Sequence, residues 1–179
     1  MTSDPDGLTT PAPAAAPWLS PAVFLATCGG VGRLGLAPGT AGAAVGAVLA
    51  AGMAASELPL AVEAAALVAI NAVGVPICTR AVALLGRGSD PGAIVYDEAA
   101  SLPLGLLVVP PSARSPLLIA AAFLLHRLFD ISKLPPGRQL ERLPGGLGIM
   151  ADDWAASAWM AVGLIAIRWL TRVGGPPWI

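Results

Sequence analysis

The stretch that decides the fold class is LGLAPGTAGAAVGAVLAAGMAAS, residues 34–56, which carries no charged side chain. A helix-breaking Pro38-Gly39 pair opens the apolar part, and Thr40 to Ala55 is rich in Ala, Gly, Val and Leu. This segment is the best candidate in the chain for a membrane-spanning helix. Small residues recur in it every four positions, at Gly42, Gly46 and Ala50. We interpret this stripe as helix packing, because small residues let two helix backbones approach closely.

Four further uncharged runs follow along the chain: Ala64–Thr79, Ala99–Ala113, Ser115–His126 and Trp154–Ile167. Each is shorter than the roughly 18 to 20 residues that a spanning helix needs, although bordering basic side chains can lengthen the effective span by reaching the interface. The runs are rich in Ala and Leu, without the alternation typical of strands. We therefore expect an all-α, multihelical bundle with several apolar, membrane-embedded helices. A soluble oligomer with a buried bundle would show the same runs.

Composition supports one domain with a membrane environment. The chain has 179 residues, of which 56% are hydrophobic and only 12% are charged. Residues 1–21 are rich in Pro and Ala and predict a disordered tail, and residues 22–179 predict a single helical domain. The net charge of -1 argues against nucleic acid as a partner. Asp4 and Asp6 stand where a secretory signal carries basic residues, so we expect the chain to stay on the cytoplasmic side.

The acidic side chains gather at the junctions between apolar runs. Asp97 and Glu98 are adjacent in GAIVYDEAAS, just before one of the uncharged runs. Neighbouring positions on a helix point about 100° apart, so we expect these two carboxylates to diverge rather than share one ligand. In that arrangement one carboxylate would bind the ligand, and the other would support the first carboxylate. The alternative is a helix N-terminus, where acidic side chains are favoured by the helix dipole.

A second junction is HRLFDISKLPPG, residues 126–137, where Arg127, Asp130 and Lys133 follow one another three positions apart. Two basic groups beside a carboxylate can hold a phosphate and a divalent cation together. The alternative is a solvated helix end with ordinary ion pairs, ended by Pro135 and Pro136. His126 has apolar neighbours and no partner evident in the sequence. We therefore expect it to pack in the core or support a ligand, not to act as a general base.

The third junction is GGLGIMADDW, in which Gly145 and Gly146 precede Asp152 and Asp153. Glycine loops that enter a helix expose amide groups suited to a phosphate, and they are also common structural turns. Five acids at three junctions, with a single His and no Ser-His-Asp pattern, favour oxygen ligation of a hard cation such as Mg²⁺. The acids in question are Asp97, Glu98, Asp130, Asp152 and Asp153.

In these segments the chain resembles the phosphatidylglycerophosphatase A family of bacterial lipid phosphatases. The resemblance rests on four ordered motifs: GLAPGTAGA (35–43), GAIVYDEAAS (92–101), HRLFDISKLPPG (126–137) and GGLGIMADDWAAS (145–157). It implies a multihelical fold and places the family's polar set on Pro38, Gly39, Thr40, Asp97, Glu98, Arg127, Asp130, Lys133, Gly145, Gly146, Asp152 and Asp153. Ser101 and Ser157 stand where the family usually has Gly.

The resemblance implies a Mg²⁺-dependent phosphatase that converts phosphatidylglycerophosphate into phosphatidylglycerol at the inner face of the bacterial cytoplasmic membrane. The five acids would then bind metal and catalyse, and Thr40, Arg127, Lys133, Gly145 and Gly146 would hold the substrate phosphate. The partners would be the phospholipid substrate and the bilayer, with homo-oligomerisation left open. Basic residues are frequent between positions 127 and 142, which predicts that this segment faces the cytoplasm. A small ion-binding transporter and a non-catalytic helical scaffold are the alternatives.

Overall fold

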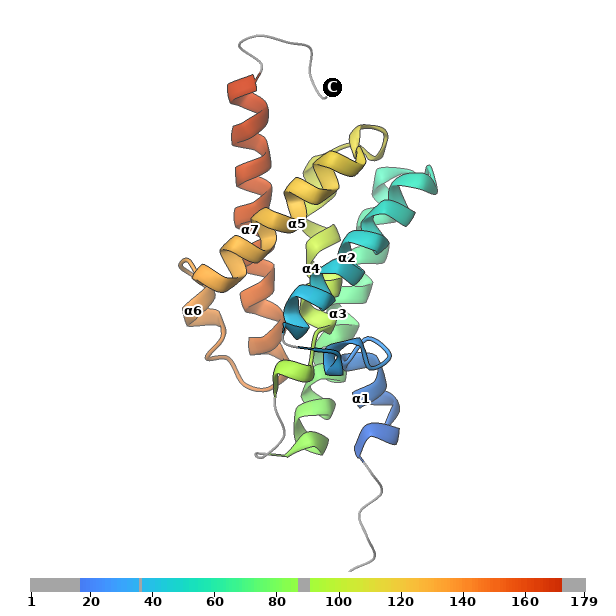
Figure 1. Ribbon diagram of the computed structural model, residues 1–179, viewed down its shortest axis with the longest axis vertical. Helices are drawn as coiled ribbons and strands as arrows, with labels where there is room; N and C mark the ends of the chain where they lie inside the picture. Colours follow the sequence, from blue (N-terminus) through green and yellow to red (C-terminus); the bar gives the residue numbers. More distant parts are fainter. Residues whose placement is uncertain (1–16, 36, 87–90, 172–179) are drawn as a thin grey trace, which may run out of the picture.

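The computed structural model describes residues 17–35, 37–86 and 91–171, and every regular element in these ranges is helical (Figure 1). The α-helices in them are α1 (Pro21–Ala26), α2 (Pro38–Ala55), α3 (Leu60–Leu85), α4 (Tyr96–Gly105), α5 (Pro116–Ser132), α6 (Gly137–Leu140) and α7 (Gly146–Thr171). Short 3-10 turns precede or separate them: η1 (Pro17–Leu19), η2 (Val31–Arg33), η3 (Pro91–Ala93), η4 (Leu106–Val108) and η5 (Pro111–Ala113). The predicted all-α class is confirmed.

The predicted N-terminal tail lies mostly outside the described residues, which begin at position 17. Trp18, inside the predicted tail, packs against the hydrophobic core. The guanidinium carbon of Arg33 lies 4.4 Å from the centre of the Trp18 ring, a distance suited to a cation–π contact. Pro21 then occupies the first turn of α1, where its missing N–H leaves no helical hydrogen bond unmade.

In the part of the chain that the structure describes, three helices are long and apolar enough to cross a membrane: α2, α3 and residues 146–170 of α7. The prediction that α2 is a candidate span is confirmed by its length and composition, but α3 is the more apolar helix, with a mean hydropathy of 2.0 against 1.4 for α2. The prediction that runs 64–79 and 154–167 are too short was wrong, because α3 and α7 each continue through charged positions to 26 residues. In α3, Glu63 is buried and forms an ion pair with Arg114, so the helix passes through this position without an unpaired charge.

The stripe of small residues on α2 serves close helix packing, as predicted, and the structure shows that the partner is α4. Gly42, Gly46 and Ala50 are all buried. A Cβ atom on Gly42 would lie 2.7 Å from the Cβ of Val95, and one on Gly46 would lie 2.9 Å from the carbonyl oxygen of Ala99. The two helices therefore approach so closely that only hydrogen fits at these positions of α2.

Helix α4 is short and lies in the middle of the molecule, packed against α2, α3 and α7 (Figure 1). Nearly all of its residues are buried. Its Ala100 belongs to a core cluster shared with α1, α3 and α7, and its Leu102 belongs to a second cluster with α2, α5 and α7. A polar side chain placed on this helix is consequently held in the interior.

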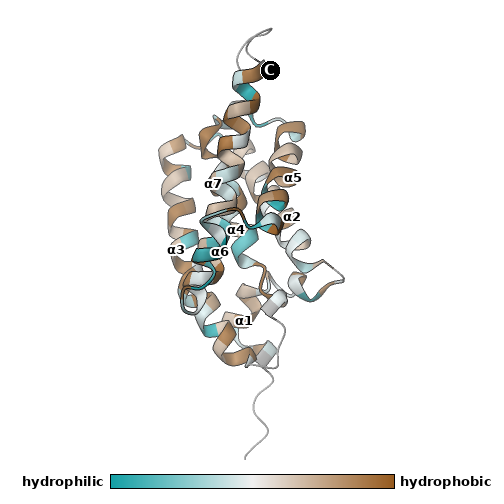
Figure 2. Ribbon diagram, turned by 90° about the vertical axis from the view of Figure 1, so that its left-hand side faces the viewer, coloured by the Kyte–Doolittle hydropathy of each residue, from teal (hydrophilic) through white to brown (hydrophobic). Residues whose placement is uncertain are grey.

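The ends of α5 and α7 bring the polar segments together around α6. Pro116 begins α5, and its end at Ser132 is followed by Lys133 in the left-handed conformation, with φ of 46°. Gly145, with φ of 60°, precedes α7 in a conformation that suits glycine. Figure 2 shows that hydrophilic residues gather around α6, whereas α3 and the C-terminal part of α7 are largely apolar.

Candidate functional site

The centre of the candidate site is a group of three buried carboxylates. Asp97 and Glu98 lie in the first turn of α4, and Asp153 comes from α7. One oxygen from each side chain lies within 4.8 Å of the others. The prediction that Asp97 and Glu98 diverge was wrong. The 100° rotation sets where each side chain leaves the helix, but the rotatable bonds of Asp and Glu let one oxygen of each carboxylate lie near an oxygen of Asp153.

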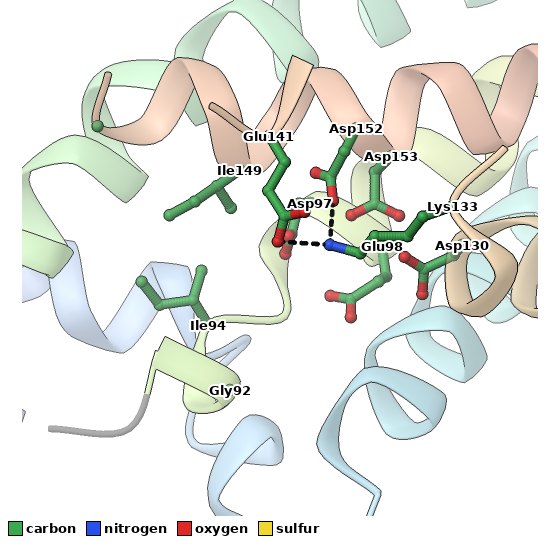
Figure 3. Close-up of a pocket in the computed structure, with 11 residues that line it drawn as sticks. Gly92, Ile94, Asp97, Glu98, Asp130, Lys133, Glu141, Ile149, Asp152 and Asp153 are labelled. Carbon is green, nitrogen blue, oxygen red and sulfur yellow. Dashed lines mark hydrogen bonds and ion pairs between the residues drawn. The ribbon is translucent and has the colours of Figure 1, made fainter. Parts of the chain in front are cut away.

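The neighbouring Asp152 takes a different direction from Asp153. Its Oδ2 atom accepts a hydrogen bond from Lys133 Nζ at 3.0 Å. The same ammonium lies 2.6 Å from Oε1 of Glu141, at the C-terminal end of α6 (Figure 3). Lys133 therefore links α6 to α7, and the structure gives it these two partners instead of a pairing with Asp130. Its pKa is raised by the hydrogen bonds and charges of Glu141 and Asp152, which outweigh the effect of burial.

Arg127 and Asp130 lie one turn apart on α5 and pair directly. Nη1 of Arg127 is 2.5 Å from Oδ2 of Asp130 and 3.7 Å from Oε1 of Glu98. The first turn of α2 reaches the same place, since a Cβ atom on Gly39 would lie 2.4 Å from Oε1 of Glu98 and 2.9 Å from Nη1 of Arg127. A guanidinium thus stands between the α5 carboxylate and the α4 carboxylate.

These groups surround a pocket of about 250 Å³. Seven of its eleven lining residues are charged, and the lining includes seven of the residues predicted from the sequence. The lining residues are Gly92, Ile94, Asp97, Glu98, Asp130, Lys133, Glu141, Gly145, Ile149, Asp152 and Asp153. The predicted acids therefore come together in one place, from α4, α5 and α7.

Three predicted residues are not among those that line the pocket. Thr40 is exposed in the first turn of α2, and Arg127 reaches the site through Glu98 and Asp130. The backbone N–H of Gly146 donates to Oγ1 of Thr79 at 2.9 Å, so this amide is already engaged within the protein. Of the two predicted glycines, Gly145 is the one that faces the pocket.

Burial of several carboxylates together raises their pKa values. Asp97 has a pKa well above its usual range because it is buried and because Glu98 and Asp153 carry like charges nearby. Burial also raises the pKa of Glu98, and the Arg127 charge opposes part of that rise. Asp130 likewise has a raised pKa owing to burial, opposed by Arg127 and Lys133.

The donor set fits a hard cation. Among the described residues, Oδ1 of Asp97, Oε2 of Glu98 and Oδ1 of Asp153 are buried oxygens without a hydrogen-bond partner. Buried polar atoms without partners are costly, and a divalent cation would satisfy all three. This buried acidic group could therefore hold a metal ion, with oxygen ligands only.

Two further groups stand next to this cluster: His126, expected from the sequence to pack in the core or support a ligand, and Glu141, which sequence reasoning missed. His126 is fully buried on α5, and its Nε2 atom lies 3.1 Å from Oγ of Ser101 and 3.6 Å from Oδ1 of Asp153. The prediction that it has no partner was wrong. Burial, helped by the Arg127 charge, lowers the pKa of His126 to about 3. Glu141 was missed, since a turn at two prolines and the short α6 bring it back to Lys133, and no helical spacing signals such a return.

Comparison with known proteins finds relatives whose names are those of phosphatases. The chain is 38% identical over 81 residues to phosphatidylglycerophosphatase A of Haemophilus influenzae, a match that covers 45% of this chain and 48% of that protein. It is 37% identical over 83 residues to a Bacteroides thetaiotaomicron protein provisionally named phosphatidylinositol-3-phosphatase. That match covers 46% of this chain and 52% of that protein. The chain thus spans about half the length of the curated relatives it matches. No solved structure matches it.

The family comparison covers the whole of the site. The family model described as phosphatidylglycerophosphatase A matches residues 24–168, which include α2 to α6, most of α7 and every residue that lines the acidic pocket. The match therefore extends over well more than half of the chain, and the chain belongs to the phosphatidylglycerophosphatase A family.

Proposed function

We propose that this protein is a Mg²⁺-dependent lipid phosphatase that hydrolyses phosphatidylglycerophosphate to phosphatidylglycerol and phosphate in phospholipid biosynthesis. The observation that carries the proposal is a group of three buried carboxylates beside two basic side chains. Asp97, Glu98 and Asp153 offer ligand oxygens within 4.8 Å of one another, and each has a buried oxygen without a hydrogen-bond partner. Family membership and the name of the Haemophilus influenzae relative support the same reaction.

In this proposal Asp97, Glu98 and Asp153 hold the cation. Oxygen donors are the ligands that Mg²⁺ prefers, and three carboxylates provide the negative charge needed to bind it in a buried place. When bound, the ion supplies positive charge that offsets the charge of a phosphate monoester. The pocket of about 250 Å³ next to these carboxylates leaves room for a phosphate group.

Arg127 and Lys133 bind the phosphate oxygens in this proposal. Arg127 is oriented by Asp130 and Glu98, and its planar guanidinium can donate two parallel hydrogen bonds to a phosphate. Lys133 is held by Glu141 and Asp152, and its ammonium can turn toward a bound anion. Carboxylates outside the metal group, Asp130 and Asp152, are then placed to orient the attacking water or take its proton.

The lipid part of the substrate fits the apolar helices. With α2, α3 and α7 across the cytoplasmic membrane, acyl chains would remain in the bilayer while the head group enters the polar pocket near α6. The basic residues of segment 127–142 favour a cytoplasmic position for that pocket. We infer from this charge pattern that the active site faces the cytoplasm.

The test is phosphate release from lipid vesicles by the purified protein, with Mg²⁺ and with EDTA. Substrates would be phosphatidylglycerophosphate and, because of the Bacteroides thetaiotaomicron relative's name, phosphatidylinositol 3-phosphate. We expect Mg²⁺-dependent release from the first substrate. A transporter or a scaffold would release phosphate from neither lipid.

A pair of matched variants assigns the activity to the acidic group. Asp153→Asn keeps the shape of the side chain and removes its charge, and we expect it to abolish turnover. Glu57→Gln removes an exposed acid at the opposite end of α2 and should behave as the wild type. If Asp153→Asn keeps more than about a tenth of the activity, equivalent to less than roughly 1.4 kcal/mol of transition-state stabilisation, Asp153 is not a catalytic ligand.

A further inference from the structure

The single histidine of the chain stands where α4, α5 and α7 meet behind the acidic group. Its side chain has no exposed surface, so water cannot supply its hydrogen bonds. Nε2 faces two oxygens, Oγ of Ser101 at 3.1 Å and Oδ1 of Asp153 at 3.6 Å. Nδ1 has no hydrogen-bond partner among the described residues.

The neutral ring carries one proton, and the surroundings decide which nitrogen holds it. With the proton on Nδ1, a buried N–H would lack an acceptor. Nε2 could then accept the Ser101 hydroxyl proton, but its lone pair would also face the Asp153 oxygen, which is an acceptor when that carboxylate is ionised and binds a cation. With the proton on Nε2, the N–H lies between two oxygen acceptors, and only a lone pair on Nδ1 stays unused. The second arrangement avoids both penalties, so the proton belongs on Nε2.

We propose that His126 is a positioning residue, whose Nε2–H is shared between Ser101 and Asp153 and holds the Asp153 carboxylate in the metal-binding group. The proposal rests on the proposed function, since it assigns Asp153 to a cation site. Oδ1 of Asp153 has no hydrogen bond in the described structure, and at 3.6 Å a small rotation of the carboxylate would bring it into hydrogen-bond range of Nε2. Carboxylates that bind metals are themselves usually oriented by such hydrogen bonds.

A second contact fixes the same three helices relative to one another. Oγ of Ser157 donates to the carbonyl oxygen of Ser101 at 2.7 Å. Ser157 lies four positions after Asp153, on the same face of α7. The chain of contacts from His126 to Ser101 to Ser157 therefore joins α5, α4 and α7 one turn away from Asp153, and it limits how far the Asp153 backbone can move from the imidazole.

The first test reads the proton directly. Because the chain has one histidine, ¹⁵N-histidine labelling of a protein purified without a histidine tag gives a single imidazole in the NMR spectrum. At pH 7 we expect a neutral ring with the proton on Nε2, and a change in the Nε2–H signal in Asp153→Asn. A proton on Nδ1, or a signal that Asp153→Asn leaves unchanged, would overturn the proposal. This test needs neither metal nor activity.

The second test measures binding of Mn²⁺ alone, by its electron paramagnetic resonance signal. His126→Phe keeps a ring of similar size without the N–H, and we expect about 10 to 100-fold weaker Mn²⁺ binding. His126→Gln places an amide N–H near the position of Nε2 and should recover most of the affinity. Ile119→Ala, a buried change elsewhere on α5, controls for general destabilisation and should bind as the wild type.

The outcomes separate the two proposals. Equal Mn²⁺ affinity in wild type and His126→Phe would refute the positioning role. A wild type that binds no Mn²⁺ would refute the metal site of the proposed function, and the NMR result would still decide whether His126 contacts Asp153. Failure of His126→Gln to recover binding, with the variant folded, would also count against the N–H contact.

Discussion

The close approach of α2 and α4 makes Gly46→Ala a sharp test of how the site is built. A Cβ atom at this position would lie 2.9 Å from the carbonyl oxygen of Ala99, 3.0 Å from that of Glu98 and 3.2 Å from the Cα of Ala99. All three are backbone atoms of α4, so no side chain can rotate to make room. The two helices would have to separate by a few tenths of an ångström, and α4 would carry Asp97 and Glu98 with it.

The size of the effect follows from a control on the same helix. Gly52 has nothing within 4 Å of an added Cβ atom, so Gly52→Ala gains helix propensity alone, about 0.5 to 1 kcal/mol. Gly46→Ala gains the same propensity but loses about 1 to 3 kcal/mol by overpacking. We therefore expect Gly46→Ala to be less stable than Gly52→Ala by about 1 to 3 kcal/mol.

The assay is unfolding of both variants in detergent micelles, followed by tryptophan fluorescence. Gly46→Ala should unfold at a lower denaturant concentration than Gly52→Ala and should also lose phosphatase activity per folded molecule. Equal stability of the two variants would refute the close contact between α2 and α4. Lower stability with undiminished activity would show that the carboxylates tolerate a shift of α4.

Three further predictions concern other contacts. Arg114→Met leaves Glu63 buried without its partner and should lower the free energy of unfolding by about 3 to 5 kcal/mol in a denaturant titration, whereas an unchanged midpoint would mean that the pair is not buried in solution. Lys133→Met should lower kcat/KM about 10 to 150-fold at an unchanged Mg²⁺ requirement, because it removes the ammonium that contacts the substrate phosphate. Glu141→Gln is the control, since it changes a partner of Lys133 and keeps the ammonium. A change confined to the Mg²⁺ requirement would refute the contact between Lys133 and the phosphate. Burial, with a contribution from the Glu98 charge, raises the pKa of Cys28 from 9.0 to about 11. Alkylation of Cys28 by iodoacetamide at pH 8 should therefore be about 100-fold slower than in the unfolded chain, and the rate should rise with pH. Peptide mass spectrometry measures both rates, and equal rates in the folded and unfolded chain would contradict the prediction.

The local sequence pattern predicted where helices occur better than it predicted the residues at which they begin and end. The helix expected at Thr40–Ala55 and its packing stripe were both visible, because small residues at a four-residue spacing imply one face of one helix. The lengths of α3 and α7 were not visible. Whether a helix continues past a charge depends on whether that charge finds a partner, and Glu63 finds Arg114 from a segment far along the chain.

The residues of the acidic group could be predicted, but their partners could not. Acids in a chain with few charges stand out wherever they occur, so Asp97 and Asp153 were both selected. Their convergence depends on how α4 and α7 pack, which no single segment encodes. The same holds for His126, whose contact with Ser101 joins α5 to α4. Spacing within one helix shows which side chains share a face, and contacts between helices need the fold.

The distribution of charge favours a binding site over a structural use of these acids. Six acidic residues line the pocket, Asp97, Glu98, Asp130, Glu141, Asp152 and Asp153, out of eleven Asp and Glu in the whole chain. Lys133 is the one basic residue among the lining groups in the described part of the chain, and Arg127 pairs with two of the acids from beside the pocket. Lys133 likewise pairs with two of the acids, Glu141 and Asp152. Asp97 and Asp153 have no Lys or Arg partner among the described residues, unlike Glu63, which pairs with Arg114. Like charges gathered in a buried pocket instead repel one another and resist ionisation, which costs stability unless a cation joins them. Among the described residues, such a group of buried acids occurs once, at Asp97, Glu98 and Asp153. Arg127 and Lys133 lie within reach of it. This arrangement supports a site for a metal ion and a phosphate rather than a scaffold.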